Sequence, residues 1–198
     1  EDTRPSLEAQ ICNLADEIAY NNHDIDDGLR AGLLSERDLT SIRLYSRHSS
    51  AVETEYPGLA RRRHIHETIR RMIDAQVTDL LAQSEALIAD ARPGSVEDVR
   101  RMPALIGFST VMAEENREMK MFLRENLYRH YQVLRMTYKA RRILSDLFAA
   151  FIADPRLLPT QYQELADAEG VARAVADYIA GMTDRYAIKE FRRLYAVD

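Results

Sequence analysis

Apolar residues recur at helical spacing along almost the whole chain. The first segment carries one apolar stripe with i, i+4, i+7, i+11 spacing, which is typical of a helix that buries a single face. This pattern predicts a helix from about Pro5 to His23, with the proline in the first turn, and a shorter helix from Asp24 to Leu34. The residues of the stripe are Leu7, Ile11, Leu14 and Ile18.

Two long helices are the strongest structural predictions. The first extends from about Ala60 to Ala89 and is stopped by the Arg92-Pro93-Gly94-Ser95 sequence. The second extends from about Glu114 to Ala153. One face of the first long helix is expected to carry Ile65, Ile69, Met72, Ile73, Val77, Leu80 and Leu81.

The segments before and between the long helices carry turn and cap signals. Ser35 to Asp38 forms a capping box, which marks a new helix start. The polar stretch 46–58 ends in Pro57-Gly58 and predicts a turn or loop. Residues 96–110 are the least helical part, and a short extended segment is expected near 104–110.

Further caps divide the C-terminal part into short helices. Asp154-Pro155 places a cap residue before a first-turn proline, and Thr160 to Gln163 is another capping box. One helix is predicted from Gly170 to Ala180, and the last from Thr183 to Leu194. The pattern predicts an all-α protein without an internal repeat or a clear linker.

Composition agrees with a globular helical chain. Apolar residues make up 46% of the 198 residues and charged residues 30%, while glycine and proline are scarce. The longest apolar stretch, 147–153, is far shorter than the roughly 20 residues of a bilayer span. Cys12 is the single cysteine, and no signal-peptide pattern opens the chain, so a cytoplasmic protein without membrane contact is expected.

The net charge of −5 argues against a protein that coats nucleic acid. Lysine is rare among the basic residues: 24 of the 27 are arginines, whose planar guanidinium suits phosphate and carboxylate groups. Codon bias in a GC-rich genome is the simpler explanation of this preference.

The first helix carries the clearest candidate chemistry. At 100° per residue, Asp16 and Tyr20 lie opposite to the apolar stripe and Asp24 lies near the edge of that side, so the three follow one another at i, i+4, i+8 on a polar side of the helix. At this spacing the first carboxylate suits a cation, the phenol suits contact with a sugar or an aromatic ring, and the second carboxylate suits a ligand hydroxyl. The alternative interpretation is a plain solvated helix face, and geometry alone favours that alternative.

Four motifs, found in the same order along the chain, favour a functional site over a plain solvated face. Residues 6–10 (SLEAQ) and 15–29 (ADEIAYNNHDIDDGL) closely resemble the last metal-ligand segment of bacterial deoxyguanosine triphosphate triphosphohydrolases, which belong to the HD superfamily. RRMI at 70–73 with VTDL at 77–80, MKMFLRENLYRHY at 119–131 and DYIAGMTDRYA at 177–187 resemble later segments of the same family. The resemblance covers the whole chain as the C-terminal portion of such an enzyme. It implies that 1–34 are the end of the HD domain and 59–198 a C-terminal helical region.

The resemblance implies an activity and a metal. Members of the family use a divalent ion such as Mg²⁺ or Mn²⁺, held by a histidine, a His-Asp dyad and a final aspartate, to release deoxynucleoside and tripolyphosphate from a dNTP. Asp16 matches the final aspartate. Tyr20 and Asp24 match positions that contact the sugar of the nucleotide, where Asp24 accepts a hydrogen bond from the 3′-hydroxyl.

The resemblance also assigns the substrate-side helix. Lys120 matches a phosphate-side cation and Tyr128 an aromatic residue near the sugar, while Arg124 and Arg129 are weaker candidates. Lys120, Arg124 and Tyr128 share one face at i, i+4, i+8. His130 is more simply explained as a structural histidine than as a nucleotide contact.

The other metal ligands and the acid–base histidine of the family precede this segment. No catalytic residue is therefore expected within this chain, and we expect the chain alone to hold the metal weakly or not at all and to be inactive. His23-Asp24 is an unsuitable dyad, because the family's dyad lies well upstream in a glycine- and histidine-rich stretch. His64 and His66 are two residues apart, so they point to different helix faces.

The expected partners are a dNTP substrate, dGTP foremost, and further copies of the chain, since the family assembles as dimers or hexamers. Arg61-Arg62-Arg63-His64 forms a basic cluster at a helix start and is a candidate for the regulatory nucleotides or single-stranded DNA that some members bind. A solvated or salt-bridged face is the favoured alternative for this cluster. For the whole chain, the alternative function is a non-catalytic helical module for assembly or for nucleotide or single-stranded DNA sensing.

Overall fold

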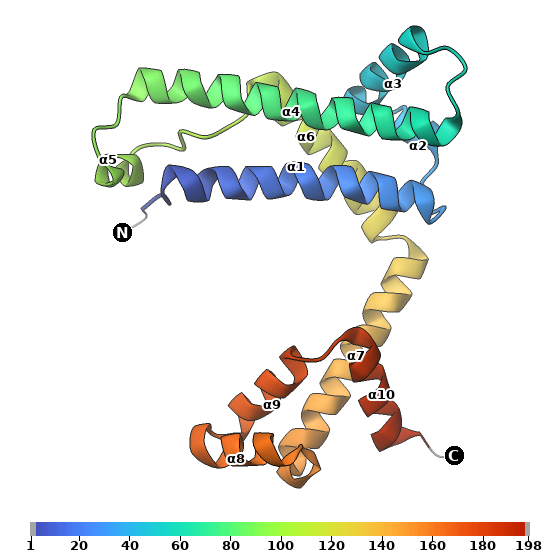
Figure 1. Ribbon diagram of the computed structural model, residues 1–198, viewed down its shortest axis with the longest axis vertical. Helices are drawn as coiled ribbons and strands as arrows, with labels where there is room; N and C mark the ends of the chain where they lie inside the picture. Colours follow the sequence, from blue (N-terminus) through green and yellow to red (C-terminus); the bar gives the residue numbers. More distant parts are fainter. Residues whose placement is uncertain (1–2, 197–198) are drawn as a thin grey trace. The chain divides into compact units, whose positions relative to one another are not determined.

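The computed structural model describes residues 3–196, and every regular element within that range is a helix (Figure 1). The all-α prediction is confirmed. The chain divides into two compact units, Glu1–His130 and Tyr131–Asp198. Within the described range, no helix combines the length and the apolar character needed to cross a membrane.

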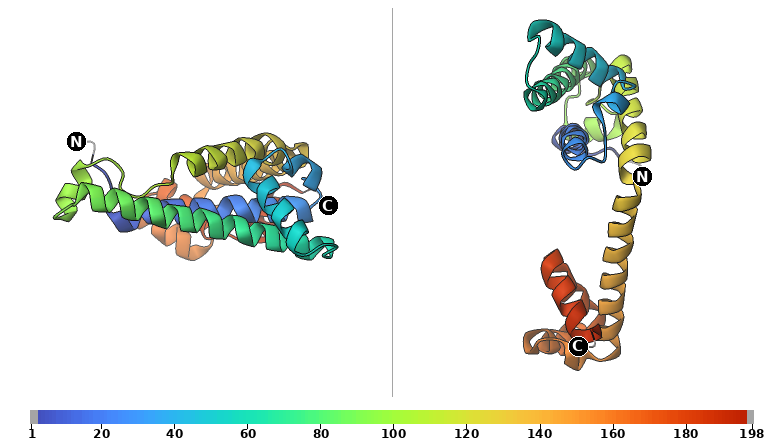
Figure 2. Two further views of the ribbon diagram at one scale, coloured as in Figure 1. Left: turned by 90° about the horizontal axis from the view of Figure 1, so that it is seen from above. Right: turned by 90° about the vertical axis from the view of Figure 1, so that its right-hand side faces the viewer.

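The first unit is built around two long antiparallel helices, α1 and α4, which lie side by side in the views of Figures 1 and 2. Helix α3 packs on α4, and α6 packs on both α1 and α3. The elements are α1 (Leu7–Arg30), α2 (Glu36–Leu39), α3 (Arg43–Glu55), α4 (Arg61–Ala91), α5 (Val96–Arg101), α6 (Thr110–Leu123) and the π-helical turn η1 (Arg124–Tyr128).

Helix α1 is one continuous helix, so the predicted break between His23 and Asp24 is wrong. Ser6 caps its first turn by accepting a hydrogen bond from the Ala9 amide. Burial of Ile25 and Leu29 carries the apolar face past the predicted break. Gly28 permits the return of the chain, since a Cβ there would lie 2.7 Å from the Leu34 side chain.

Residues 46–55 form most of α3, so the loop predicted for 46–58 is wrong. Tyr45 and Val52 are fully buried in this helix, and this tertiary burial outweighs the polar character of the segment. The turn is confined to the residues around Pro57-Gly58, where Gly58 has a positive φ of 75°. The capping box of Ser35 and Asp38 is confirmed at the start of α2.

Helix α4 confirms the first long helix, and Arg92 ends it with a left-handed backbone (φ 47°). Its predicted apolar face is correct only in part, because Val77 and Leu81 are 40% and 50% exposed. The buried positions of these turns are taken by polar Gln76 and Ser84 as well as by Leu80.

The segment near 104–110 is an irregular connection and not a strand. Its backbone amides at Leu105 and Ile106 donate to the buried side chain of Gln10 at 3.1 and 3.4 Å. A side chain of α1 therefore satisfies the donors that a neighbouring strand would otherwise satisfy. The preceding residues form the short helix α5, although this part was predicted to be the least helical.

The second predicted long helix is interrupted. Helix α6 ends at Leu123, the wider turn η1 follows, and α7 begins only at Tyr131. The amide of His130 donates to the Leu127 carbonyl in the intervening turn (3.0 Å). Apolar periodicity alone does not distinguish a continuous helix from two helices with such a turn between them.

The second unit is a small helical bundle in which α7 contacts α9 and α10, and α8 contacts α9. The caps predicted at Asp154 and Thr183 are confirmed. The cap predicted at Thr160 is wrong, because Pro159 precedes the helix and no side chain caps it. The elements are α7 (Tyr131–Ala153), the 3₁₀ turn η2 (Pro155–Leu157), α8 (Thr160–Glu169), α9 (Val171–Ala180) and α10 (Asp184–Tyr195).

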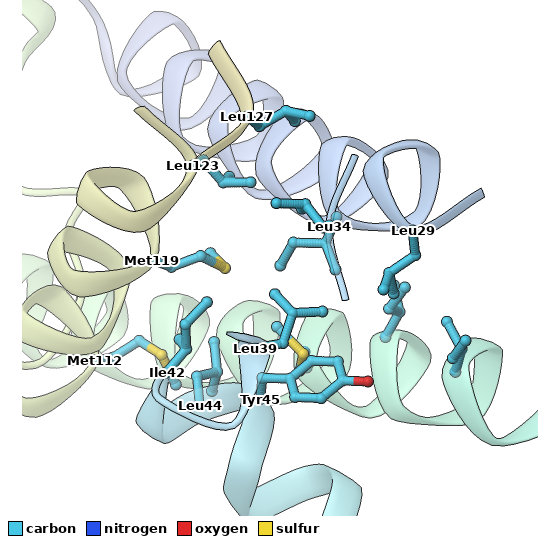
Figure 3. Packing of buried hydrophobic residues seen from close by; sticks show 14 residues of the cluster. Leu29, Leu34, Leu39, Ile42, Leu44, Tyr45, Met112, Met119, Leu123 and Leu127 are labelled. Carbon is cyan, nitrogen blue, oxygen red and sulfur yellow. The ribbon is translucent and has the colours of Figure 1, made fainter. Parts of the chain in front are cut away.

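Each unit has its own apolar core. In the first unit, side chains of α1, α2, α3 and α6 point toward one another (Figure 3). Met119, Leu123 and Leu127 pack there against Leu34 and Leu39. Leu147 and Phe151 of α7 form the centre of the second core, together with residues of α9 and α10. The first core fixes α1 against α6, and these two helices carry the candidate site.

Candidate functional site

The polar face of α1 carries the three residues singled out by the sequence. Because α1 is continuous, Asp16, Tyr20 and Asp24 follow one another at successive turns. Asp16 is exposed, and no hydrogen bond or ion pair joins its carboxylate to another described residue. Tyr20 is 61% exposed and Asp24 is half-buried. This face therefore offers one unpaired carboxylate and one that is held in place.

Asp24 is held by Tyr128, whose hydroxyl donates a short hydrogen bond to the Asp24 Oδ2. The two residues are 104 positions apart in the chain, and η1 brings the phenol to α1. Burial raises the pKa of Tyr128, and the hydrogen bond and charge of Asp24 raise it further. The phenol thus stays protonated and donates, while the carboxylate remains an acceptor.

Lys120 is the second link between α6 and α1. Its Nζ lies 3.0 Å from the Glu17 Oε2, one residue after Asp16. Arg124 is exposed and forms no ion pair with another residue of the described range, and Arg129 is also exposed. The π-helical geometry of η1 begins at Arg124, so the α-helical i, i+4, i+8 face expected for Lys120, Arg124 and Tyr128 ends there.

A buried polar chain lies beneath this face and connects three helices. The Asn22 Nδ2 of α1 donates to the Gln76 Oε1 of α4 at 2.6 Å. The Gln76 Nε2 in turn donates to the Asn116 Oδ1 of α6. The Asn22 and Gln76 residues are fully buried, and Asn116 nearly so. Directional hydrogen bonds of this kind fix the register of the helices more sharply than apolar contacts do.

A buried carboxylate adds a second fixed contact. Glu115 of α6 has a side chain that is only 4% exposed, and Arg47 of α3 binds both of its oxygens at 2.6 and 2.8 Å. His48, the next residue, has an Nε2 without a hydrogen-bond partner among the described residues. Burial lowers the pKa of His48, and the positive charge of Arg47 lowers it further.

The described residues do not assemble a complete metal centre, since no group of three His, Cys, Asp or Glu side chains converges among them. Of the three residues of the polar face, Asp16 best fits the chemistry of a hard cation, as an exposed carboxylate without a partner among the described residues. His64 and His66 point in different directions, as expected. His64 lies 3.2 Å from the Ser49 carbonyl, and His66 is exposed.

The arrangement therefore offers one carboxylate, that of Asp16, for a cation. Tyr20 follows one turn later, and Asp24, a fixed carboxylate, follows two turns later. Lys120 and Arg124 add positive charge from α6 and η1. Residues 106–193 match the family described as the phosphohydrolase-associated domain. The matched residues comprise 106–130 of the first unit and most of the second unit.

The chain as a whole is similar to curated relatives called deoxyguanosinetriphosphate triphosphohydrolase-like proteins. It is 60% identical to the one from Azoarcus sp. (strain BH72) over 195 residues and 56% identical to the one from Ralstonia nicotianae over 198. These alignments cover 98% and 100% of this chain but 51% of each relative, so the chain spans about half their length. The resemblance to the C-terminal portion of such proteins is confirmed.

Sequence reasoning missed the buried polar residues and the partners of the site. Asn21 and Asn22 lie within about 60° of the apolar pole of α1, so their place on the core side was visible in the helical projection. Glu17 and Arg47 gave no such signal. Their roles depend on contacts with residues 103 and 68 positions away, which local periodicity does not contain.

Proposed function

We propose that this chain is part of a metal-dependent dNTP triphosphohydrolase that converts a dNTP, dGTP foremost, to deoxynucleoside and tripolyphosphate. Residues 1–34 would complete its HD domain, and 59–198 would form its C-terminal helical region. The names of the relatives support this proposal. The observation that carries it is the Asp24–Tyr128 hydrogen bond, which joins two distant segments that the resemblance assigns to the substrate site.

Asp16 is the proposed metal ligand of this chain. Its exposure and lack of a partner suit that role, whereas the neighbouring Glu17 is occupied by Lys120. A bound divalent cation would offset the negative charge of the triphosphate and supply an activated water near neutral pH. The other ligands would have to come from outside the described residues, so the chain alone is proposed to be inactive.

The substrate-side roles follow from the same contacts. Asp24, fixed by Tyr128, accepts a hydrogen bond from the sugar hydroxyl, and Tyr20 covers the sugar from the preceding turn. Arg124 offers an unpaired guanidinium to the phosphates, while Lys120 is positioned by Glu17. A fixed acceptor binds more tightly than a mobile one, because less conformational entropy is lost on binding.

The test compares this chain with a protein that also contains the other half of its relatives' length. With dGTP and Mn²⁺ or Mg²⁺, the longer protein should release tripolyphosphate and the 198-residue chain should not. In the longer protein, Asp16→Asn should lower kcat/KM by more than roughly 100-fold, the upper end of what an outer-shell change costs. Full activity of Asp16→Asn would overturn the metal role, and turnover by the short chain would overturn its proposed inactivity.

Asp24→Asn tests the sugar contact in the longer protein. The loss of a charged acceptor should lower kcat/KM by roughly 10- to 100-fold. Asp27→Asn is the matched control, since Asp27 is an exposed carboxylate of the same helix. Equal effects of the two substitutions would mean that only the charge of α1 matters.

A role in assembly is a second proposal, and exposed apolar residues of α7 favour it. Leu134 and Tyr138 lie one turn apart on the same face of α7 and are 52% and 71% exposed. Single apolar residues are common on surfaces, whereas neighbouring ones on one face suit an interface. Light scattering should show an oligomer that Tyr138→Glu weakens, and a monomer at every concentration would contradict this role.

A further inference from the structure

The second unit contains an apolar groove between α7 and α10, which contact each other (Figure 1). Two cavities of about 130 and 460 Å³ form this groove, and they are continuous because Lys139, Ile143 and Ile188 line both of them. The lining comes from 136–144 of α7 and from 184–192 of α10, so the groove follows each helix for roughly 12 Å. None of these residues belongs to the proposed metal or substrate site.

The floor of the groove is apolar and held in place by the second core. Ile143 and Ala187 are 7% and 6% exposed and belong to that core, against which Ile188 and Phe191 also pack. At the edge of the groove the side chain of Leu144 is 43% exposed. A fixed apolar floor with an exposed apolar edge suits a partner that carries an apolar stripe of its own.

The charge of the groove is positive. Lys139, Arg142 and Arg192 line it, against one carboxylate, that of Asp184 in the smaller cavity. Arg142 pairs with Asp146 at 3.5 Å, and both side chains are partly exposed, so water screens this pair. Lys139 and Arg192 form no ion pair with a carboxylate of the described residues. Two cations of the groove are therefore available to a partner.

The same imbalance extends over the two helices that form the groove. Together α7 and α10 carry eight basic and three acidic residues, whereas α8 and α9 carry one basic and four acidic residues. The charges of the second unit are thus segregated, and the groove lies on the basic side of this division. A positive field of this kind attracts an acidic partner and raises its association rate.

Shape and charge together select the class of partner. A symmetric contact between two copies of the chain would bring each basic groove against another, which the like charges oppose. A nucleic acid binds mainly through its phosphates and would leave the apolar floor without contacts. An acidic amphipathic helix uses both features, because its apolar stripe fills the groove while its carboxylates reach the cations.

We propose that the groove between α7 and α10 is a docking site for an acidic amphipathic helix of a partner protein. The apolar stripe of this helix packs on Ile143, Ile188 and Phe191, and its carboxylates pair with Lys139 and Arg192. The groove accommodates about two turns of such a helix. The site is independent of the proposed hydrolytic function.

The probe for the test is a fluorescein-labelled synthetic peptide of about 18 residues, with leucine at i, i+3, i+4 and i+7 and glutamate on both flanks. Fluorescence anisotropy measures its binding to the 198-residue chain. The acidic peptide should bind at least roughly tenfold more tightly than a scrambled peptide of the same composition or a peptide with lysine in place of glutamate. Its affinity should also fall as the salt concentration rises.

Two pairs of matched variants locate the bound peptide. Lys139→Glu should weaken binding by roughly tenfold, because a repulsion replaces an attraction. Lys189→Glu is its control, since Lys189 is exposed on α10 and lines neither cavity, and its effect should stay below about threefold. Leu144→Asp should weaken binding by roughly tenfold, whereas Phe148→Asp, at a similarly exposed position of α7 outside the lining, should have little effect. Circular dichroism checks that all four variants keep the helical content of the wild type.

Other occupants of the groove give other results, and each overturns the proposal. If a protein that also contains the other half of the relatives' length fails to bind the peptide, the other half covers the groove. If self-association of the chain at rising concentration displaces the peptide, the occupant is a second copy. If an oligothymidylate strand binds more tightly than the peptide and is weakened by Lys139→Glu, the occupant is a nucleic acid. Absence of saturable peptide binding, or equal weakening by Lys139→Glu and Lys189→Glu, also overturns the proposal.

Discussion

The two units differ in what they bury. Eight polar or charged residues are buried among the described residues, and all of them lie in the first unit. The buried residues of the second unit are aliphatic or aromatic, with Phe151 and Tyr162 packed around Tyr178. The first unit therefore combines an apolar core with a polar chain, and the second relies on apolar packing.

This difference agrees with what each unit is proposed to position. Apolar contacts tolerate small shifts, whereas a buried hydrogen bond that is lost leaves an unsatisfied group. The chain from Asn22 through Gln76 to Asn116 links α1, α4 and α6, and α1 and α6 carry the proposed ligands. Buried polar groups cost stability but specify one helix arrangement, and a site with two partners on different helices needs such an arrangement.

The largest expected effect is in the second unit. Phe151→Ala should lower its free energy of unfolding by roughly 3–5 kcal/mol, because a fully buried ring leaves a cavity. Phe148→Ala is the matched control: the ring is 40% exposed on the same helix and should cost less than about 1 kcal/mol. Hydrogen exchange of peptides from α7 to α10 measures the change. A similar loss of free energy of unfolding in the two variants would show that Phe151 is not part of an apolar core.

The buried ion pair should give the next largest effect, in the first unit. Arg47→Ala leaves the buried Glu115 carboxylate without its partner and should cost roughly 2–3 kcal/mol, reduced from the fully buried case because Arg47 is half-exposed. Denaturant unfolding followed by circular dichroism measures this loss. Arg43→Ala breaks the more exposed pair with Glu118 and should cost less than about 1 kcal/mol. Equal losses of free energy of unfolding in the two variants would mean that the burial of Glu115 does not strengthen its ion pair with Arg47.

The sequence predicts features that depend on neighbouring residues, but not those that depend on distant ones. The helical class, α4 and the caps at Ser35 and Thr183 were predictable, because they depend on neighbours within one or two turns. The polar face at Asp16, Tyr20 and Asp24 was predictable for the same reason. Helix α3 was missed because its helicity depends on tertiary burial of Tyr45 and Val52. The partners of Glu17, Asp24 and Glu115 were not predictable from periodicity, since they lie on distant segments.

The free energy of unfolding of the first unit should depend on pH through the protonation of His48. Burial lowers its pKa below the usual 6.5, so the folded state disfavours the protonated form. Its contribution to stability is therefore complete above pH 6.5 and is lost as the pH falls through the lowered pKa. The free energy of unfolding should fall between pH 7 and 5 in the wild type and less in His48→Gln. An unchanged slope in His48→Gln would contradict this assignment.

The smallest expected change in stability comes from removing the hydroxyl of a buried tyrosine, of which each unit has one suitable example. The Tyr45 hydroxyl has no hydrogen-bond partner among the described residues, whereas the Tyr178 hydroxyl lies 3.2 Å from that of Tyr186. Tyr45→Phe should therefore be neutral or stabilise the protein by up to about 1 kcal/mol, and Tyr178→Phe should cost about 1 kcal/mol. Thermal unfolding monitored by circular dichroism resolves opposite signs.

Alkaline titration makes the Tyr45 comparison sharper. Burial raises the pKa of Tyr45 to about 12, above its ordinary value of 10. The unfolded chain thus releases this proton first, and the stability that depends on the neutral phenol is present below pH 10 and lost between about pH 10 and 12. Tyr45→Phe should make the decline of stability in this window shallower. A destabilised Tyr45→Phe protein with an unchanged alkaline decline would mean that the hydroxyl has a partner, and that the polar interior of the first unit is more completely paired than its geometry indicates.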